Sequence, residues 1–338
     1  MGKKDIRGQV VVITGASSGI GRAAANAFAE RGARLVLAAR RKHLLKEAAA
    51  DCRSRGTEAV AVATDVTIPD DVLKLRDEAL RAFGRIDVWI NNAGTGVFGP
   101  YLEAPLELHR RTVEVDLLGA MHGAYAALGV FEAQGQGTLI NNVSLGGWSP
   151  APLAAAYTAA KFGLRGFSAS LRQEYADRPA IHVCAVFPAM IDTPGLAHGA
   201  NVTGKNIDTG PLLYRAEQVA ETFVALVRRP RDEVAVGWPA RAAQVGYALA
   251  RGPVERLIAA AMRRSLARAE PGATREGSLL LPTDNVGNTD GGWLARKKVP
   301  DAPTLSVLGS AGFAALALGA FLMRKRSSAS GERLPNRA

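Results

Sequence analysis

Cysteine is scarce in this chain, and an N-terminal apolar leader is absent. Its 338 residues include only Cys52 and Cys184, which lie far apart and outside any CxxC or histidine-rich pattern. This argues against a disulfide framework and against a structural zinc site. The apolar stretch from Val10 to Ile13 runs directly into glycines and is too short for a signal peptide. We therefore expect the folded domain to lie on the cytoplasmic side.

Aromatic residues make up only 6% of the chain, and its positive charge is unevenly distributed. The net charge is +11, and the segments 228–275 and 296–338 carry most of the excess. These basic segments border an apolar run and lack the interleaved aromatic residues on which nucleic-acid bases stack. Anionic lipid is therefore the expected partner of this charge, and nucleic acid is not expected.

Short β-rich runs alternate with helical stretches along the first 240 residues. The expected strands fall at 9–14, 34–39, 58–64, 87–93, 137–144, 181–187 and 233–237. The expected helices fall at 23–31, 44–55, 70–83, 106–130 and 153–175. Such alternation predicts an α/β fold with a parallel sheet and helices on both of its faces. Residues 1–240 are therefore predicted to form one domain.

Two further segments follow this domain. Residues 241–269 are predicted to form a basic amphipathic helical extension, with Val254 and Ile258 on one side and Arg256 and Arg263 elsewhere. Packing on the domain surface and lying on a membrane surface are both open interpretations of this extension. Residues 270–303 are rich in Gly, Pro, Asn and Asp and are predicted to be a linker. Their TDNVGNTDGG sequence lacks the terminal Glu of a calcium loop, so no metal is assigned.

A long uncharged stretch lies near the C-terminus. Ala302–Met323 carries no charge over 22 residues, and a helix of this length spans the roughly 30 Å of a bilayer core. Residues 304–323 are predicted to form a transmembrane helix, followed by a basic polar tail at 324–338. A buried or peripheral helix rich in Ala and Gly is the alternative. A single C-terminal anchor is thus expected to tether the domain to the membrane.

The sequence TGASSGIG at Thr14–Gly21 lies between the first expected strand and the first expected helix. This is the context that a dinucleotide-binding turn requires. One glycine permits the tight turn, a second lets the backbone approach a pyrophosphate, and a third allows close packing of helix and strand. The predicted cofactor-binding residues of this turn are Gly15, Ser17, Ser18, Gly19, Ile20 and Gly21.

The second expected strand ends at Ala39, where an NAD-selective site places an acidic residue beside the ribose. Arg40 and Arg41 follow instead. A guanidinium can bind a 2′-phosphate through two parallel hydrogen bonds, so these residues predict a preference for NADP(H). A solvated pair of arginines at a strand end is the alternative interpretation.

Tyr157 and Lys161 are four residues apart on an expected helix and therefore share one face. Ser144 lies thirteen residues before Tyr157, at the end of the strand GTLINNVS, and NNAG at Asn91–Gly94 follows another strand. With these motifs in this order, residues 6–240 resemble the short-chain dehydrogenase/reductase family. The resemblance implies a Rossmann-type doubly wound parallel sheet of about seven strands. It also implies a homodimer or homotetramer.

The resemblance assigns roles to residues that match the family's motifs. It implies that Ser144, Tyr157 and Lys161 perform the chemistry, and that Tyr157 and Lys161 also contact the cofactor. The remaining implied cofactor contacts are Asp65 and Val66 at the adenine, Asn92, Ala93 and Gly94 along the cofactor channel, and Pro188, Ile191 and Thr193 at the nicotinamide.

The residue types suit carbonyl reduction, because the alkoxide that forms when hydride arrives needs a proton. Tyr157 is expected to act as general acid or base, although a free phenol has a pKa of about 10. Lys161 is expected to lower that pKa and to hold the nicotinamide ribose, and Ser144 to hold the substrate oxygen. The predicted activity is hydride transfer between NADP(H) and a carbonyl or secondary alcohol.

The substrate is expected to be a lipophilic small molecule, because the candidate lining residues are apolar. These candidates are Leu145, Trp148, Met190, Leu196 and Leu212. Two other interpretations remain open. One is a membrane-bound scaffold or sensor of the same fold that binds nucleotide without turnover. The other is a soluble enzyme whose tail packs on a partner.

The chain departs from the family pattern at two positions. Asp116 stands where the family has Asn, and it is included in the predicted catalytic set. The family residue acts mainly through its backbone carbonyl, which Asp also has, so we expect activity with an altered pH dependence. Ala189 stands where the family has Gly after Pro188, so we expect the nicotinamide loop to sit differently.

Overall fold

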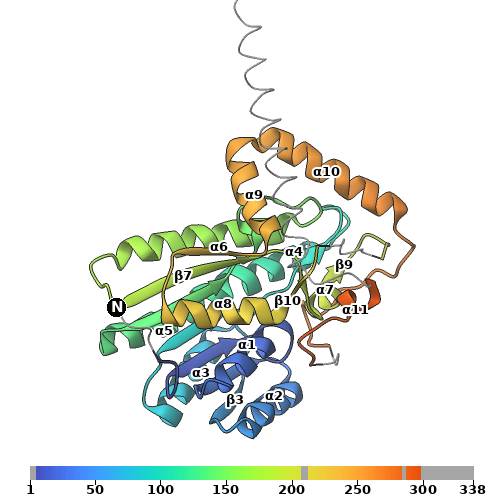
Figure 1. Cartoon of the computed structure of the whole chain (residues 1–338). Helices are drawn as coiled ribbons and strands as arrows, with labels where there is room; N and C mark the ends of the chain where they lie inside the picture. Colours follow the sequence, from blue (N-terminus) through green and yellow to red (C-terminus); the bar gives the residue numbers. More distant parts are fainter. Residues whose placement is uncertain (1–4, 207–211, 284–286, 298–338) are drawn as a thin grey trace, which may run out of the picture.

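A computed structural model describes residues 5–206, 212–283 and 287–297 of the chain (Figure 1). Its centre is a seven-stranded sheet in the order β3-β2-β1-β4-β6-β7-β11, and every neighbouring pair is parallel. The strands are β1 (Val10–Thr14), β2 (Arg34–Ala39), β3 (Ala59–Ala63), β4 (Val88–Asn91), β6 (Gly137–Asn142), β7 (Ile181–Pro188) and β11 (Glu233–Val236). The predicted α/β fold is confirmed.

Successive residues of β1 pack into different halves of the core. Val11 and Ile13 belong to the half that also contains apolar residues of α1, α2 and α8. Val10 and Val12 belong to the half that contains residues of α3, α5 and the end of α6. This is the alternation expected of a strand covered on both faces. The helices are α1 (Gly19–Ala29), α2 (Lys42–Ser54), α3 (Pro69–Phe83), α5 (Gly119–Gln134), α6 (Ala155–Glu174) and α8 (Ala216–Arg228).

The single helix expected at 106–130 is divided into three parts. α4 (Leu106–Val113) leads into a π-helical turn at Glu114–Leu118, and α5 continues from Gly119. A π-turn places an extra residue in one turn and so changes the direction of the side chains within it. The residue whose direction matters here is Asp116, which lies in the π-turn and is buried.

Short elements lie beyond the carboxyl ends of the central strands. β5 (Val97–Phe98) pairs with β9 (Ala200–Asn201), and β8 (Ile191–Asp192) pairs with β10 (Tyr214–Arg215). A single-turn helix, α7 (Gly195–His198), lies between β8 and β9 along the chain. These pairs bring the segment after β4 and the segment after β7 together above the sheet edge.

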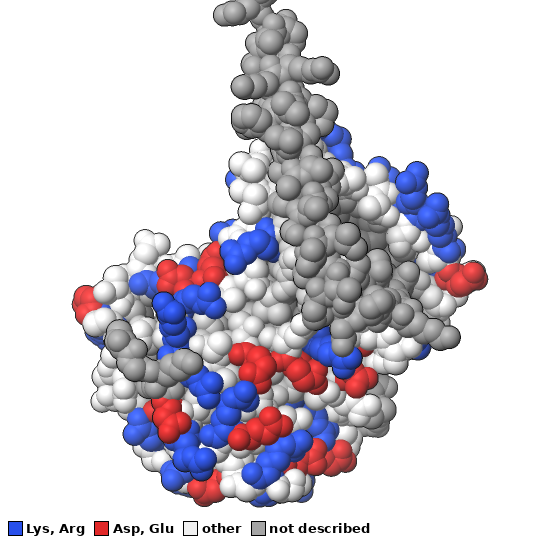
Figure 2. Space-filling model, in the orientation of Figure 1, with Lys and Arg blue, Asp and Glu red and all other residues white. Residues whose placement is uncertain are grey.

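The basic extension forms two helices, α9 (Trp238–Leu249) and α10 (Arg251–Arg268). α9 packs on the domain through the buried Ala240, and α10 stands off the body of the domain in Figure 1. α10 contacts α9, where Tyr247 donates a hydrogen bond to Glu255, and none of its own residues is buried. Figure 2 shows basic side chains along its outer edge, whereas both signs of charge are mixed over the lower part of the domain.

The predicted transmembrane helix at 304–323 and the polar tail at 324–338 lie outside the described residues. Within the described part of the chain, no helix is both long and apolar enough to cross a bilayer. The segment predicted as a linker, 270–303, is described over 270–283 and 287–297. It includes α11 (Trp293–Lys297) and makes many contacts with the domain.

Candidate functional site

The candidate site lies where the strand order reverses, at the carboxyl ends of β1 and β4. From β1 the chain builds the sheet outward first through β2 and β3, and then through β4, β6, β7 and β11 on the other side. The connections therefore leave β1 and β4 in opposite directions, and the strand ends between them are where folds of this topology place their ligand crevice. Side chains from these strand ends form the floor of the site.

Asn92, Thr14 and Asn142 connect three strand ends through hydrogen bonds. The Asn92 amide nitrogen Nδ2 donates to the Thr14 carbonyl at 3.0 Å, and the Ala93 backbone N–H donates to Thr14 Oγ1 at 3.1 Å. Asn142 Nδ2 donates to Asn92 Oδ1 at 2.9 Å. The predicted residues Asn92 and Ala93 thus lie directly against the glycine turn.

The glycine turn is so close to its neighbours that side chains would not fit at two positions. Gly15 has a φ of 68°, and a Cβ there would lie 2.8 Å from Ala93 Cα. A Cβ on Gly21 would overlap the Gly15 carbonyl oxygen. Only glycine therefore fits at these two positions, in the turn that leads into α1, where a phosphate-binding turn is expected.

Arg41 and Arg40 follow β2 and have different partners. Arg41 Nη2 donates to the hydroxyls of Ser17 and Ser18 at 3.0 and 2.7 Å. Arg40 donates to main-chain carbonyls of the C-terminal segment, at Ser278, Leu279 and Leu280. Burial lowers the pKa of Arg40, although Asp65 opposes this effect. The predicted residues Ser17, Ser18 and Arg41 are therefore brought together.

Asp65 is held by an arginine that the sequence did not single out. Arg111 Nη2 donates to Asp65 Oδ2 at 2.6 Å, and the Thr67 backbone and hydroxyl donate to Asp65 Oδ1 at 3.0 and 2.8 Å. Burial alone would raise the pKa of Asp65, but these bonds lower it below its usual value. Arg111 lies on α4, and only the fold brings it to the end of β3.

Ser144, Tyr157 and Lys161 come together at the carboxyl end of β6. Ser144 begins a short 3₁₀ turn at Leu145–Gly147, where its Oγ accepts a hydrogen bond from the Gly146 N–H at 3.1 Å, and its hydroxyl lowers the pKa of Tyr157. Lys161 lies one turn beyond Tyr157 on α6, and its Nζ is 5.5 Å from the centre of the Tyr157 ring. Ser144 has a φ of 150°, in a region that only glycine adopts without strain.

Asp116 contacts Lys161 directly through its side chain. The Asp116 Oδ1 to Lys161 Nζ distance is 2.8 Å, and the side chains are 0% and 5% exposed. The Thr95 backbone N–H donates to Asp116 Oδ2 at 3.2 Å, and Lys161 Nζ also donates to the Asn142 carbonyl at 3.4 Å. The sequence-based expectation that Asp116 acts mainly through its backbone carbonyl did not include this buried ion pair. The predicted residue Gly94 borders it, since a Cβ there would lie 2.8 Å from Asp116 Oδ1.

The ion pair changes the acidity of Tyr157. Burial alone would lower the pKa of Lys161, but attraction to Asp116 and Tyr157 raises it. Burial raises the pKa of Tyr157, and the Asp116 charge raises it further, while Lys161 and Ser144 lower it. Lys161 therefore acts on Tyr157 in the expected direction and lowers its pKa, while burial and Asp116 oppose it and the net direction is upward.

The segment after β7 lies against the glycine turn. A Cβ built on Gly19 would be 3.2 Å from Thr193 Cβ. Ala189 is outside the positive-φ region, and its N–H donates to the Val236 carbonyl at 2.9 Å, so alanine fits here without backbone strain.

Trp148, a candidate for the substrate side, instead stacks on Phe187 in the core with ring centres 3.8 Å apart. Met190 is 40% exposed.

The chain is similar to known proteins. Residues 9–201 match the family model described as short chain dehydrogenase. The chain is 32% identical over 324 residues to the uncharacterized oxidoreductase YxnA of Bacillus subtilis, covering 93% of this chain and 91% of that protein.

Two solved structures also resemble the chain. One is an alcohol dehydrogenase from Thermococcus sibiricus complexed with 5-hydroxy-NADP, with a TM-score of 0.60, 28% identity, and coverage of 68% of this chain and 96% of that one. The other is a short chain dehydrogenase/reductase from Burkholderia phymatum in complex with NAD, with a TM-score of 0.63, 26% identity, and coverage of 69% and 90%.

Replacing Asp116 by asparagine should lower the pKa of Tyr157. The substitution removes a negative charge that disfavours the phenolate, while Lys161 still favours it. We therefore expect the pKa of Tyr157 to be lower in the variant than in the unaltered chain. The measurement is an alkaline titration of tyrosinate absorbance, taken as the difference between each protein and the same protein with Tyr157→Phe. A pKa that is the same in the unaltered chain and in Asp116→Asn would contradict the electrostatic role of this carboxylate.

Proposed function

Because the chain is an oxidoreductase that belongs to the short-chain dehydrogenase/reductase family, we propose that it transfers hydride between NADP(H) and a carbonyl or secondary alcohol. The observation that carries this proposal is the convergence of Ser144, Tyr157 and Lys161 beside the glycine turn. Ser144 follows the carboxyl end of β6, and Tyr157 and Lys161 lie one turn apart on α6.

The crevice fits a dinucleotide on two grounds. The close approaches at Gly15 and Gly21 clear the backbone for a pyrophosphate at the start of α1. Ser17, Ser18 and Arg41 offer hydroxyl and guanidinium groups where a ribose and its 2′-phosphate would lie. Thr193 borders the same turn, so Ile191 and Thr193 are assigned to the nicotinamide end. The nicotinamide supplies or accepts the hydride when the cofactor is bound.

The side chains of the site account for the proton. Tyr157 donates a proton to the developing alkoxide in reduction and accepts it in oxidation. Ser144 holds the substrate oxygen beside the phenol. Lys161 lies between Tyr157 and Asp116 and carries the positive charge that favours the phenolate. Since Asp116 opposes that effect, the limb of the pH–rate profile that reports Tyr157 is expected at higher pH than it would be with asparagine.

The choice of NADP(H) over NAD(H) rests on charge at the adenine end. Arg40 and Arg111 lie beside Asp65, and Arg111 binds both Asp65 and Glu114, while Arg41 binds the hydroxyls of Ser17 and Ser18. Three arginines thus face two carboxylates. This leaves a positive balance where an NADP(H) 2′-phosphate would lie. One solved relative contains an NADP derivative and the other contains NAD, so the preference is argued from these arginines.

The substrate side is assigned to apolar residues near Ser144. Leu145 follows the serine directly and is partly buried, and Met190 and Leu212 leave apolar surface beyond β7. We therefore assign a lipophilic ketone, aldehyde or secondary alcohol as the substrate class.

Phenylalanine at position 157 should abolish turnover, because it keeps the ring but removes the proton donor. We expect a loss of at least about 100-fold in kcat with NADPH affinity unchanged. Turnover is measured by NADPH consumption with ketones and aldehydes of increasing chain length, and affinity by tryptophan quenching. Turnover that persists in Tyr157→Phe would mean that another group supplies the proton.

Alanine at position 40 should reduce the preference for NADPH over NADH, because it removes a guanidinium assigned to the 2′-phosphate. The ratio of the two dissociation constants is expected to change by about tenfold, equivalent to about 1.4 kcal/mol. NADH affinity in the same variant is the control, since NADH has no 2′-phosphate. An unchanged ratio would remove Arg40 from the cofactor site.

Attachment to a membrane through residues 304–323 is part of the same proposal and is argued from the uncharged stretch in the sequence. The full chain is expected in the membrane fraction after an alkaline wash, and a chain ending at residue 297 in the supernatant. Equal distribution of the two chains would exclude this anchor.

A further inference from the structure

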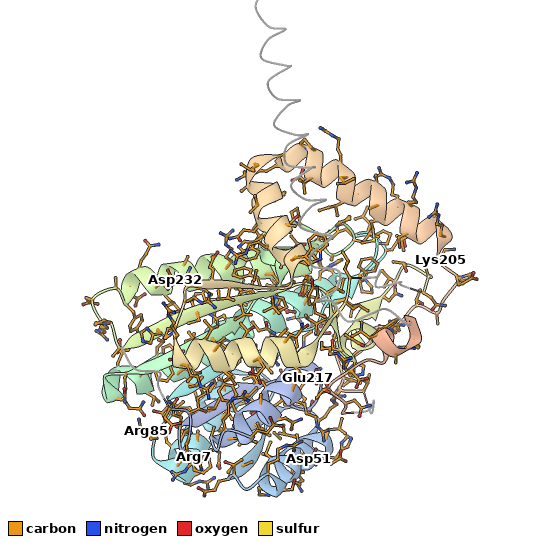
Figure 3. All side chains as sticks on the ribbon, in the orientation of Figure 1. Arg7, Asp51, Arg85, Lys205, Glu217 and Asp232 are labelled. Carbon is orange, nitrogen blue, oxygen red and sulfur yellow. The ribbon has the colours of Figure 1, made fainter. Side chains whose placement is uncertain are left out.

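The C-terminal segment returns to the domain after α10 and crosses the candidate site. Lys205, labelled in Figure 3, forms an antiparallel bridge with Pro271. Beyond it, residues 277–283 and 287–294 lie along the carboxyl edge of the sheet, and we call these two described stretches the strap. Figure 1 shows the strap and α11 beside α7 and β9.

The first stretch of the strap is fixed by one apolar anchor and by main-chain groups. Leu279 is fully buried in a small cluster with Val97, Leu108 and Ala200. The Ser278 N–H donates to the His198 carbonyl at 2.8 Å. The carbonyl of Leu279 accepts hydrogen bonds from both Arg40 and Arg111, at 3.3 and 3.4 Å. This stretch therefore covers the end of the crevice assigned to the adenosine.

The second stretch covers the glycine turn. The Gly19 N–H donates to the Asn288 carbonyl at 2.8 Å, and Arg22 Nη1 donates to the Gly287 carbonyl at 2.8 Å. Packing at Gly287 is tight, since a Cβ there would lie 3.0 Å from the Ser17 carbonyl oxygen. This stretch therefore lies against the part of the crevice assigned to the pyrophosphate.

The far end of the strap is held by Asp192. This carboxylate is 2% exposed. Its oxygens accept hydrogen bonds from the backbone N–H groups of Gly291, Trp293 and Leu294, at 2.9, 3.2 and 2.9 Å. Asp192 lies between Ile191 and Thr193, the two residues assigned to the nicotinamide. The two described stretches of the strap thus contact the parts of the site assigned to the adenosine, the pyrophosphate and the nicotinamide.

We infer that the strap is a gate, which must be released for the dinucleotide to enter or leave the crevice. This inference rests on the proposed function. Two of the groups assigned to the cofactor's phosphates, Arg40 and the Gly19 turn, already bind strap carbonyls. A charged phosphate is a stronger acceptor for a guanidinium than a neutral carbonyl is, so an incoming dinucleotide can displace the strap from Arg40.

The strap is suited to local opening. Between Gly277 and Gly292 its described residues form no helix or strand. Its apolar contacts are Leu279 and the partly buried Leu280, and its other contacts are backbone hydrogen bonds, including those to Asp192. Segments with few buried apolar contacts open at a lower free energy than the core. Release of the strap therefore does not require unfolding of the sheet.

The test uses the full chain and two variants that weaken the strap at different places. Leu279→Ala removes the buried anchor, and Gly287→Val places a side chain against Ser17 and Arg22. Leu281→Ala is the matched control, because Leu281 lies in the same stretch and is 75% exposed. NADPH association is followed by stopped-flow fluorescence, and its release by chase with excess NADP⁺.

Both weakened variants should bind and release NADPH at least about tenfold faster, the effect expected from losing a buried leucine contact in the closed state. Leu281→Ala should match the unaltered chain. Hydrogen exchange of the strap amides shows whether each variant has loosened it. Unchanged rates in a variant with a loosened strap would overturn the gate, and so would faster release with unchanged association. Failure of the unaltered chain and all variants to bind either dinucleotide would instead refute the proposed function.

Discussion

The candidate site depends on one buried ion pair, between Lys161 and Asp116. Its members come from α6 and from the π-turn before α5, and its other contacts reach Thr95 and the carbonyl of Asn142. A single charge buried away from water is strongly unfavourable, so two such charges are stable only as a pair. Removing one partner typically lowers the free energy of unfolding by about 3–5 kcal/mol. The pair therefore fixes the distance between three parts of the chain that are far apart in sequence. It also makes the position of Lys161 independent of any bound molecule.

The opposing effects on the pKa of Tyr157 follow from this ion pair. A lysine without a carboxylate neighbour would favour the phenolate more strongly. Here the positive charge is shared between Asp116 and Tyr157, and burial of the ring adds to the effect of the carboxylate. Ser144 remains as the second group that favours the phenolate. The balance among these four side chains, rather than the lysine alone, sets the acidity of the site.

The sequence predicted the sheet, the glycine turn and the Ser144, Tyr157 and Lys161 cluster, because each leaves a local pattern. Alternating apolar runs mark strands covered on both faces, and glycines mark positions where a Cβ does not fit. The π-turn left no such pattern, since its residues are compatible with a continuous helix, and the direct contact of Asp116 with Lys161 was missed with it. Arg111 reaches Asp65 only through the fold.

The strap was expected to be a linker, because its Gly- and Asn-rich composition is the same whether it is docked or free. The predicted transmembrane helix lies outside the described residues.

The backbone of Ser144 has a consequence for the thermodynamics of the whole domain. Its φ of 150° is natural for glycine and costs other residues about 1–3 kcal/mol. Replacing it by glycine would relieve that strain while deleting the hydroxyl beside Tyr157. At this position the residue that fits the backbone without strain and the residue that completes the proton-transfer cluster are therefore different, and this chain has the second.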